Sequence, residues 1–435
     1  MLFDRNMRAF AHTLVDRLFD HVETIESRPV VDWKSAPELR EVIRTTDDPV
    51  KALLDYSIQL HHPSYMGHQV CPPFPAAILG DLVISTLNQS TAVWEMSPIG
   101  TVIEQEMIRW LADLASYPAE SLGTAVSGGS AANLTGLLAA RARWRARGGD
   151  GAAVILASAD THYSVARAAS IMGVEHVVKI ETDHRHRMSL DALERALRDH
   201  GASVLAVVAT SGSTATGAFD DLERAREIAK DTWLHVDAAH GASVLLSDSL
   251  KHLVGGLDQA DSFSWDPHKM LWMPLSLGAI LVRDGQWLRR AFEADAPYLF
   301  HAERELDNIG AATIQCSKRA DAIKLWLALK MSGTEPLREA LEKVTAVTRY
   351  LHDRVVESSD FEAMHEPQFN IYCFRYRGSE EENLALREKL IRSGEAWITS
   401  TVLKGRRVLR VTMINPRTEK RHVDDMLASL RRLTR

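Results

Sequence analysis

An aspartate and a lysine, each at the end of a short apolar segment, are the side chains of this sequence best placed to do chemistry. Asp237 closes the segment WLHVD at 233–237, and Lys269 follows the segment SFSW at 262–265. A lysine amine can form a Schiff base with an aldehyde, and a carboxylate can pair with a protonated ring nitrogen. Together they suit pyridoxal 5′-phosphate (PLP), whose protonated ring draws electrons from the Cα of an amino acid. Taken singly, Asp237 could cap a helix and Lys269 could be a solvated surface lysine.

A glycine-rich turn precedes the first long helical stretch. The sequence SGGSAAN at 127–133 opens a segment that runs to Arg147 with helical spacing. Backbone N–H groups at a helix N-terminus attract anions, so Gly129 and Ser130 are candidates to hold a phosphate. The alternative is an ordinary turn in which Ser130 serves as the helix N-cap.

Three further residues fit the same cofactor. His162, in ADTHYS at 159–164, could stack on a pyridine ring or be a surface loop histidine. His268 could be a loop histidine or a second phosphate ligand, and the small side chain of Ala239 leaves space for a flat ring. An ion pair of Asp237 with a pyridinium at about 3 Å is worth roughly 5 kcal/mol at an effective dielectric of about 20, before desolvation is subtracted. The joint occurrence of these residues in this order, with Lys269, is far more specific than any one of them.

Bulk properties exclude several other classes. The chain has 435 residues and a net charge of −7 without blocks of like charge, so no nucleic-acid partner is expected. No signal peptide or membrane span is evident, and three widely spaced cysteines fit a reducing compartment, so we expect a soluble cytoplasmic protein without membrane contact. None of the 18 histidines has partners at zinc spacing, so no metal is expected. No G-x-S-x-G or G-x-G-x-x-G motif stands where a serine hydrolase or dinucleotide binder needs it.

The order of elements predicts an α/β protein. Residues 1–27 have the spacing of an amphipathic helix, and from residue 125 short apolar strands alternate with helices, which predicts a largely parallel, covered sheet. A long helical region near 319–357 leads to a smaller α+β unit. We therefore expect an N-terminal helical segment at 1–60, a large domain at 61–335 and a small C-terminal α+β domain at 336–435.

These residues resemble the PLP-dependent group II amino-acid decarboxylases, which include glutamate, cysteine-sulfinate, aromatic-amino-acid and 2,4-diaminobutyrate decarboxylases. The strongest motifs are HVDAA at 235–239 and DPHK at 266–269, and the likeness extends from about residue 62 to the C-terminus. The resemblance implies the aspartate aminotransferase fold (fold type I) and a homodimer with the site at its interface. The amphipathic N-terminal helix cannot bury its apolar face alone, so it should pack on the main body or on a second subunit, and we expect the dimer partner.

The resemblance also implies roles by position. Lys269 would carry the cofactor, Asp237 would pair with its ring nitrogen and His162 would stack on the ring, these three being the catalytic residues. Ser213 would lie near the ring substituents with Ala239, while Gly129, Ser130 and His268 would hold the phosphate. For the substrate, the implied set is His68, Gln69, His240 and Arg410, the last of which would grip a carboxylate.

Two departures from the family pattern bear on the reaction. Asp266 stands where relatives often have Asn, and a carboxylate beside a phosphate is repulsive unless it points away. The stretch 301–313 contains no Tyr, although decarboxylases usually supply a loop tyrosine that protonates the intermediate; His301 or a partner residue would have to serve. The expected activity is α-decarboxylation of an L-amino acid, with a lean toward an acidic one. The alternative is another PLP reaction, such as decarboxylation-dependent deamination, amino transfer or carbon–carbon bond chemistry.

Overall fold

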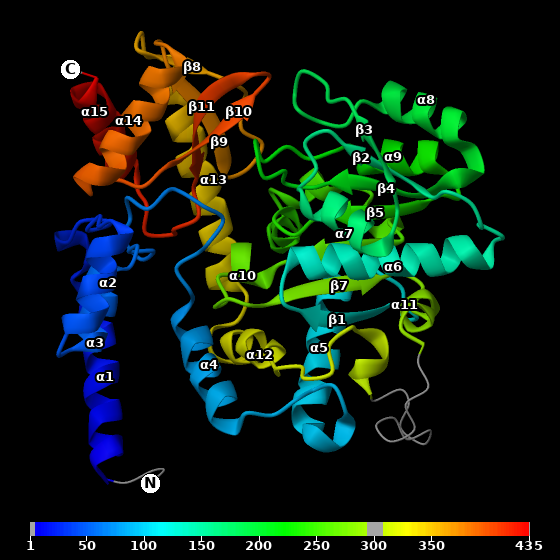
Figure 1. Cartoon of the computed structure of the whole chain (residues 1–435), viewed down its shortest axis with the longest axis horizontal. Helices are drawn as coiled ribbons and strands as arrows, with labels where there is room; N and C mark the ends of the chain where they lie inside the picture. Colours follow the sequence, from blue (N-terminus) through cyan, green and yellow to red (C-terminus); the bar gives the residue numbers. More distant parts are fainter. Residues whose placement is uncertain (1–4, 294–307, 435) are drawn as a thin grey trace. The chain divides into compact units, whose positions relative to one another are not determined.

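The computed structural model describes residues 5–293 and 308–434, and the chain divides into two compact units (Figure 1). The large unit comprises residues 73–343 with 366–369, and the small unit comprises residues 1–72, 344–365 and 370–435. The domain boundaries expected at residues 60 and 335 stay a prediction.

A seven-stranded sheet organises the large unit, in the order β1-β7-β6-β5-β4-β2-β3. Its strands are β1 (Leu122–Val126), β2 (Val154–Ser158), β3 (His176–Ile180), β4 (Val204–Thr210), β5 (Trp233–Asp237), β6 (Ser262–Trp265) and β7 (Gly278–Val282). The five strands β3, β2, β4, β5 and β6 run parallel, whereas β7 is antiparallel to both β6 and β1. Strands inside a parallel sheet are covered on both faces, and every residue of the apolar strand β4 is buried.

Helices connect the parallel strands. They are α6 (Gly129–Ala146), α7 (Ser164–Met172), α8 (Leu190–His200) and α9 (Leu222–Ala229), whereas the short α10 (Pro267–Met270) lies between β6 and the antiparallel β7, and α11 (Gln286–Ala291) follows β7. This alternation is the crossover pattern predicted from the sequence. Consequently the loops after β2, β4, β5 and β6 all lie at the carboxyl edge of the parallel strands, where ligands bind in such sheets.

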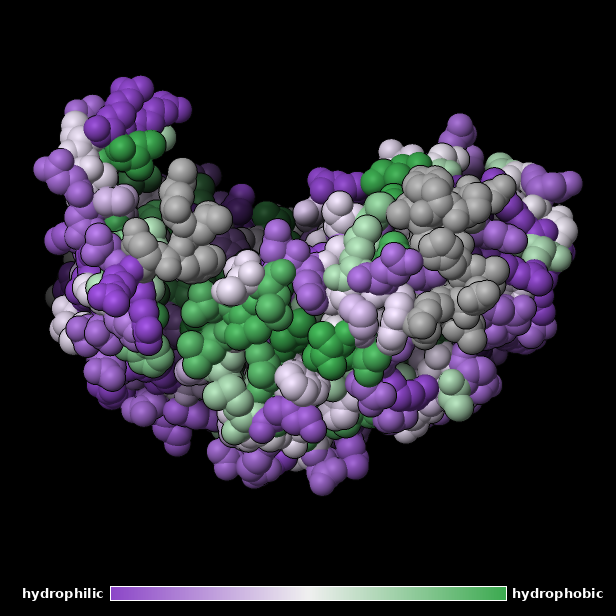
Figure 2. Space-filling view, turned by 90° about the horizontal axis from the view of Figure 1, so that it is seen from below, coloured by the Kyte–Doolittle hydropathy of each residue, from purple (hydrophilic) through white to green (hydrophobic). Residues whose placement is uncertain are grey.

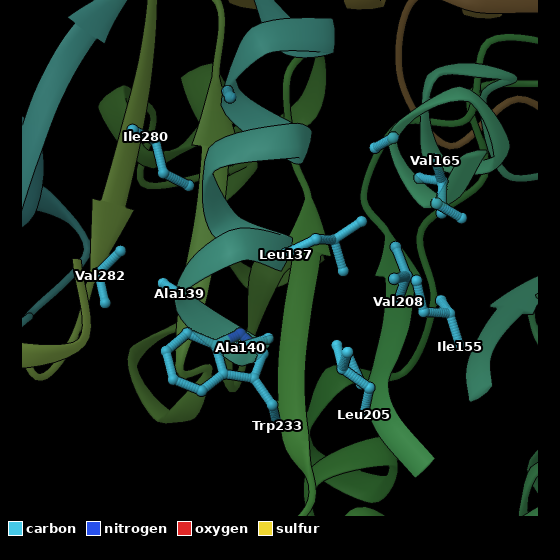
Figure 3. Close-up of a cluster of buried hydrophobic side chains, with 14 of the residues drawn as sticks. Leu137, Ala139, Ala140, Ile155, Val165, Leu205, Val208, Trp233, Ile280 and Val282 are labelled. Carbon is cyan, nitrogen blue, oxygen red and sulfur yellow. The ribbon is translucent and has the colours of Figure 1, made fainter. Parts of the chain in front are cut away.

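The core of the large unit lies between α6 and the sheet (Figure 3). Leu137 and Ala140 of α6 pack over Leu205, Trp233 and Ile280 of three strands, all of them buried. The helix approaches β5 closely at Gly136, where an added Cβ would lie 2.7 Å from the ring of His235. This close approach brings polar residues of α6 within reach of the strand ends.

Three more helices complete the large unit: α4 (Pro75–Leu87), α5 (Pro98–Leu114) and α12 (Ala322–Ser332). A buried ion pair joins Glu104 of α5 to Lys318, with exposed fractions of 1% and 2% for the side chains. Glu104 also accepts hydrogen bonds from Thr91 Oγ1 (3.1 Å), Thr124 Oγ1 (3.0 Å) and Ala125 N (2.9 Å). The carboxylate is thus satisfied on all sides, as a buried charge requires.

The small unit contains a four-stranded antiparallel sheet, in the order β10-β11-β9-β8. Its strands are β8 (Phe361–Ala363), β9 (Ile371–Tyr376), β10 (Thr399–Leu403) and β11 (Arg406–Thr412), and its helices are α1 (Arg5–Glu23), α2 (Ala36–Thr45), α3 (Pro49–Tyr56), α14 (Glu380–Ser393) and α15 (Lys420–Leu433). Helix α13 (Glu335–Val356) contains the boundary between the two units. Among the described residues, no helix is both long and apolar enough to cross a bilayer.

The α/β class and the mostly parallel large sheet are confirmed. Strand β1 was not expected, because its sequence LGTAV carries a glycine and no long apolar run. It pairs with β7 at the antiparallel edge of the sheet.

Candidate active site

Lys269 lies in a single helical turn at the carboxyl edge of the large sheet. Strand β6 ends at Trp265, and Pro267 at the first helical position of α10 starts the turn that carries the lysine. The Nζ atom of Lys269 lies 3.0 Å from Oδ2 of Asp266, whose side chain is 2% exposed. The same oxygen also borders the glycine turn, since a Cβ on Gly129 would lie 3.0 Å from it, so Asp266 does not point away from the turn.

Asp237 is held as a hydrogen-bond acceptor at the end of β5. Asn133 Nδ2 donates to its Oδ2 at 2.9 Å, while Ser264 Oγ and the Ala239 backbone N–H donate to Oδ1 at 3.1 and 3.3 Å. The residue is buried, with 7% of its surface exposed. Three donors stabilise the ionised form, which is the form needed to pair with a cationic ring nitrogen.

His162 follows β2 and is half-buried. Its Nδ1 lies 2.8 Å from Ser164 Oγ and also accepts the Ser164 backbone N–H at 3.3 Å. Burial lowers the pKa of His162, while the nearby charge of Asp237 acts in the opposite direction. The ring is thus neutral near pH 7 and oriented from one side by Ser164.

The turn before α6 is shaped for close approach. Gly128 has φ of 150°, and a Cβ on Gly129 would meet Ala239 Cβ at 2.9 Å and Asp266 Oδ2 at 3.0 Å. The N-cap is Gly128 and no side chain caps the helix, so Ser130 is not the cap that the alternative interpretation required. The N-terminus of an 18-residue helix is left for an anion, and the Ser130 side chain is exposed beside it.

His268 borders the same turn. A Cβ on Gly128 would lie 3.0 Å from its Cε1, and its Nδ1 accepts the Leu277 backbone N–H at 3.2 Å. Burial lowers the pKa of His268, so in the neutral ring Nε2 carries the proton. That N–H lies 3.6 Å from Asp266 Oδ2 and provides a donor at the edge of the turn.

The other predicted residues of the large unit are buried at the same edge. Ser213 is engaged with its own turn, since its Oγ lies 2.9 Å from Thr216 Oγ1 and accepts the Thr216 and Ala218 backbone N–H groups. His240 packs against Phe369, with ring centroids 5.8 Å apart, and is 2% exposed. Nine predicted residues thus gather at one edge of the large sheet.

The remaining three predicted residues, His68, Gln69 and Arg410, belong to the small unit. Arg410, in β11, is 6% exposed; its Nη1 donates to Thr399 Oγ1 at 3.3 Å, but its Nε and Nη2 have no hydrogen-bond partner among the described residues. The Nε2 of Gln69 and the Nε1 of Trp397 are likewise buried without an acceptor. Burial lowers the pKa of Arg410, yet a guanidinium stays charged at neutral pH.

The sequence did not single out Asn133, Ser164 and Ser264 as site residues. Each is buried and contributes to the hydrogen bonds around His162 or Asp237. Asn133 lies between buried Ala132 and Thr135 of α6, and a polar amide at a buried helical position requires partners. A polar residue at a helical position expected to be buried was therefore the signal from which the sequence could have identified Asn133.

These residues fit PLP. The uncapped, glycine-lined helix N-terminus suits a phosphate, and a Cβ at Gly129 would fill part of that space. Asp237 provides an ionised acceptor, Lys269 an amine and Ala239 a flat floor. The fold and the site define a fold type I PLP enzyme.

Comparison with known proteins names the family. Residues 28–377 match the model of the pyridoxal-dependent decarboxylase conserved domain, so the chain belongs to this family and is a PLP-dependent amino-acid decarboxylase. The chain is 30% identical to an aromatic-L-amino-acid decarboxylase of Bacillus atrophaeus, over 98% of this chain and 95% of the relative. It is also 30% identical to the human acidic amino acid decarboxylase GADL1, over 92% and 85%.

A solved structure has a similar fold. The rice (Oryza sativa) TDC with PLP and tryptamine superposes with a TM-score of 0.91 at 25% identity, covering 100% of this chain and 98% of that one. Relatives of similar identity thus have names that refer to different substrates. The comparisons define the reaction class and leave the substrate to be argued from the site.

Proposed function

We propose that this enzyme removes the α-carboxylate of an acidic L-amino acid as CO₂, with Arg410 as a carboxylate-binding group. The observation that carries the proposal is the buried guanidinium, which has two unpartnered nitrogen atoms and no ion pair among the described residues. Leaving such donors unpaired is costly, so the guanidinium suits an anionic ligand with two acceptor oxygens. The similarity to the human acidic amino acid decarboxylase supports the same substrate class.

The donors near Arg410 extend this argument. Trp397 lies two residues before Thr399, the residue that pairs with Arg410 across β10 and β11. Gly67 packs on Trp397, and Gln69 follows two residues later. The unpartnered N–H groups of Gln69 and Trp397 provide donors for a second acidic group of the substrate.

In the large unit, the residues have separate tasks. When bound, PLP supplies an electron sink that stabilises the negative charge left at Cα. Lys269 would hold the cofactor through its amine, and Asp237 would keep a proton on the ring nitrogen. His162 covers the ring, while the α6 N-terminus, Ser130 and His268 hold the phosphate. These assignments are supported by their common location and hydrogen bonds.

The substrate is tested by measuring CO₂ and amine release from a panel of acidic, aromatic and diamino L-amino acids. We expect acidic substrates to give the highest kcat/KM. Replacing the guanidinium, as Arg410→Met, should raise KM for them at least tenfold, whereas Arg407→Lys on the same strand should have little effect. A preference for aromatic or diamino substrates, or an unchanged KM in Arg410→Met, would contradict the proposal.

The cofactor lysine is tested separately. Lys269→Ala should bind PLP without the visible absorbance of a Schiff base, and sodium borohydride should fail to attach the cofactor covalently. Retention of both signals would show that another lysine carries the cofactor.

A second candidate keeps the cofactor but changes the product. It rests on the absence of tyrosine from 301–313, a stretch whose first part, with His301, lies outside the described residues. Without a loop tyrosine to protonate Cα, decarboxylation-dependent deamination, amino transfer or carbon–carbon bond chemistry are the alternatives. A stoichiometric amine without aldehyde or ketone would exclude them.

We also propose a homodimer. Helix α4 exposes five large apolar side chains, and the segment after it exposes three more: Ile78, Leu79, Leu82, Val83, Leu87, Met96, Ile99 and Val102. Figure 2 shows a broad apolar area on this side of the molecule, and contiguous exposed apolar surface often marks a protein interface. Leu82→Glu should give monomers in analytical ultracentrifugation, whereas Ile171→Glu, at an equally exposed site on α7, should not. A wild-type monomer at micromolar concentration would refute this assembly.

A further inference from the structure

Asn133 connects two groups that bracket the proposed cofactor ring. Its Nδ2 donates to Asp237 Oδ2 at 2.9 Å and to Ser164 Oγ at 3.0 Å, and its Oδ1 lies 3.0 Å from His235 Nε2. The residue is 1% exposed. One amide therefore contacts Asp237 directly and reaches His162 through Ser164.

The direction of these hydrogen bonds follows from one fact: an ionised carboxylate can only accept. Because Asp237 accepts, the Asn133 amide must turn its nitrogen to Asp237 and its oxygen to His235. The His235 Nε2 must then carry a proton. Burial lowers the pKa of His235 to about 4, so its Nδ1 is a bare acceptor, 2.8 Å from Ser262 Oγ.

The second branch fixes His162. Since Asn133 donates to Ser164 Oγ, the Ser164 hydroxyl proton is free to point at His162 Nδ1, 2.8 Å away. The Ser164 backbone N–H, 3.3 Å from the same atom, requires the same polarity. The proton of neutral His162 must then sit on Nε2, the nitrogen remote from Ser164.

We propose that Asn133 is a positioning residue that sets the protonation pattern on both sides of the cofactor: it holds Asp237 ionised toward the ring nitrogen and, through Ser164, holds His162 as the Nε2–H tautomer. This inference rests on the proposed roles of Asp237 and His162. It assigns to Asn133 a chemical role beyond packing, because the amide's donors and acceptor are used in a fixed direction.

The test compares holoenzymes of wild type, Asn133→Leu, Asn133→Asp and Ser164→Ala. PLP labelled with ¹⁵N reports protonation of the ring nitrogen by NMR, and ¹⁵N-histidine spectra, assigned with His162→Gln, report the tautomer of His162. The dissociation constant of PLP is measured by spectrophotometric titration, and thermal melting checks the fold. None of these readouts requires turnover.

Asn133→Leu keeps the branched shape of the side chain but loses the hydrogen bond to a charged group, so PLP should bind roughly ten- to hundredfold more weakly. Its ring-nitrogen signal should move toward the unprotonated value and its His162 tautomer should become mixed. Asn133→Asp places a second carboxylate against Asp237, so PLP binding should weaken at least as much. Ser164→Ala removes the 2.8 Å hydroxyl donor and leaves only the 3.3 Å backbone N–H on His162 Nδ1, so the His162 tautomer should become mixed while the ring-nitrogen signal stays at the wild-type value.

Three results would overturn the proposal. One is a loaded Asn133→Leu enzyme with wild-type ring-nitrogen and His162 signals. If that variant does not fold or load, the decisive result is Ser164→Ala with an unchanged His162 tautomer. A wild-type enzyme whose ring nitrogen is unprotonated would overturn the role of Asp237 together with this inference, and the variants would not be needed to see it.

Discussion

The buried ion pair between Glu104 and Lys318 gives a prediction whose size follows from the structure. Glu104→Gln removes one charge and leaves the Lys318 ammonium, 2% exposed, without a counter-charge. The new amide also presents two donors where Thr91, Thr124 and Ala125 N donate at 2.9–3.1 Å. Breaking one side of a buried pair costs about 3–5 kcal/mol. We expect a loss of this size in the free energy of unfolding of the large unit.

The assay is urea unfolding, followed by far-ultraviolet circular dichroism and tryptophan fluorescence. With a slope of about 3 kcal/mol per M, the midpoint should fall by at least about 1 M urea. Glu106→Gln, an exposed residue on the same helix, is the matched control and should leave the midpoint unchanged.

A double variant separates charge from packing. Glu104→Leu with Lys318→Met removes the lone ammonium, so it should be more stable than Glu104→Gln. A midpoint for Glu104→Gln within experimental error of wild type would refute the reasoning, because it would mean that Lys318 finds water or another partner at no cost.

Three further predictions concern the site and its surroundings. Gly129→Ala should weaken PLP binding at least tenfold in spectrophotometric titration, because its Cβ intrudes into the phosphate turn, whereas Gly151→Ala, with open space around it, should not. The free energy of unfolding should decrease as the pH is lowered from about 7 to about 4.5. In the unfolded chain His235 takes up a proton at about pH 6.5, whereas in the folded chain it is buried and stays neutral until about pH 4. The contribution of His235 is up to about 3 kcal/mol, and His235→Gln should reduce the dependence on pH. Gly67→Ala should raise the substrate KM with little change in PLP affinity, because its Cβ would lie 2.3 Å from Trp397 Cδ1 and must displace the indole.

Local sequence patterns predicted the parallel strands and the strand-end location of the cofactor residues. Period and apolar content define buried strands such as β4, and a strand end determines where Asp237 must lie. The hydrogen-bond network was not predictable, because the amide of Asn133 meets Asp237 across 104 residues of sequence. Register between a helix and a sheet depends on close approaches such as Gly136 against His235, which no local pattern reports.

The same reasoning explains the outcome for Asp266 and Ser130. The sequence placed a carboxylate beside the phosphate turn but could not give its direction; in the structure its Oδ2 contacts Lys269 at 3.0 Å and also borders the turn at Gly129. The helix start could not be assigned between Gly128 and Ser130, because glycine and serine are both accepted at N-caps.

Residues 366–369 have a consequence for any attempt to dissect this enzyme. They belong to the large unit although the sequence on either side belongs to the small one. Gln368 Oε1 accepts the Phe219 backbone N–H at 2.9 Å, and the Phe369 ring lies against His240. A fragment ending at residue 343 would lack residues 366–369, so His240 would be exposed to water and the Phe219 backbone N–H would lose its acceptor. The isolated large unit should therefore be expressed with residues 366–369 fused to it, or the full chain should be used instead.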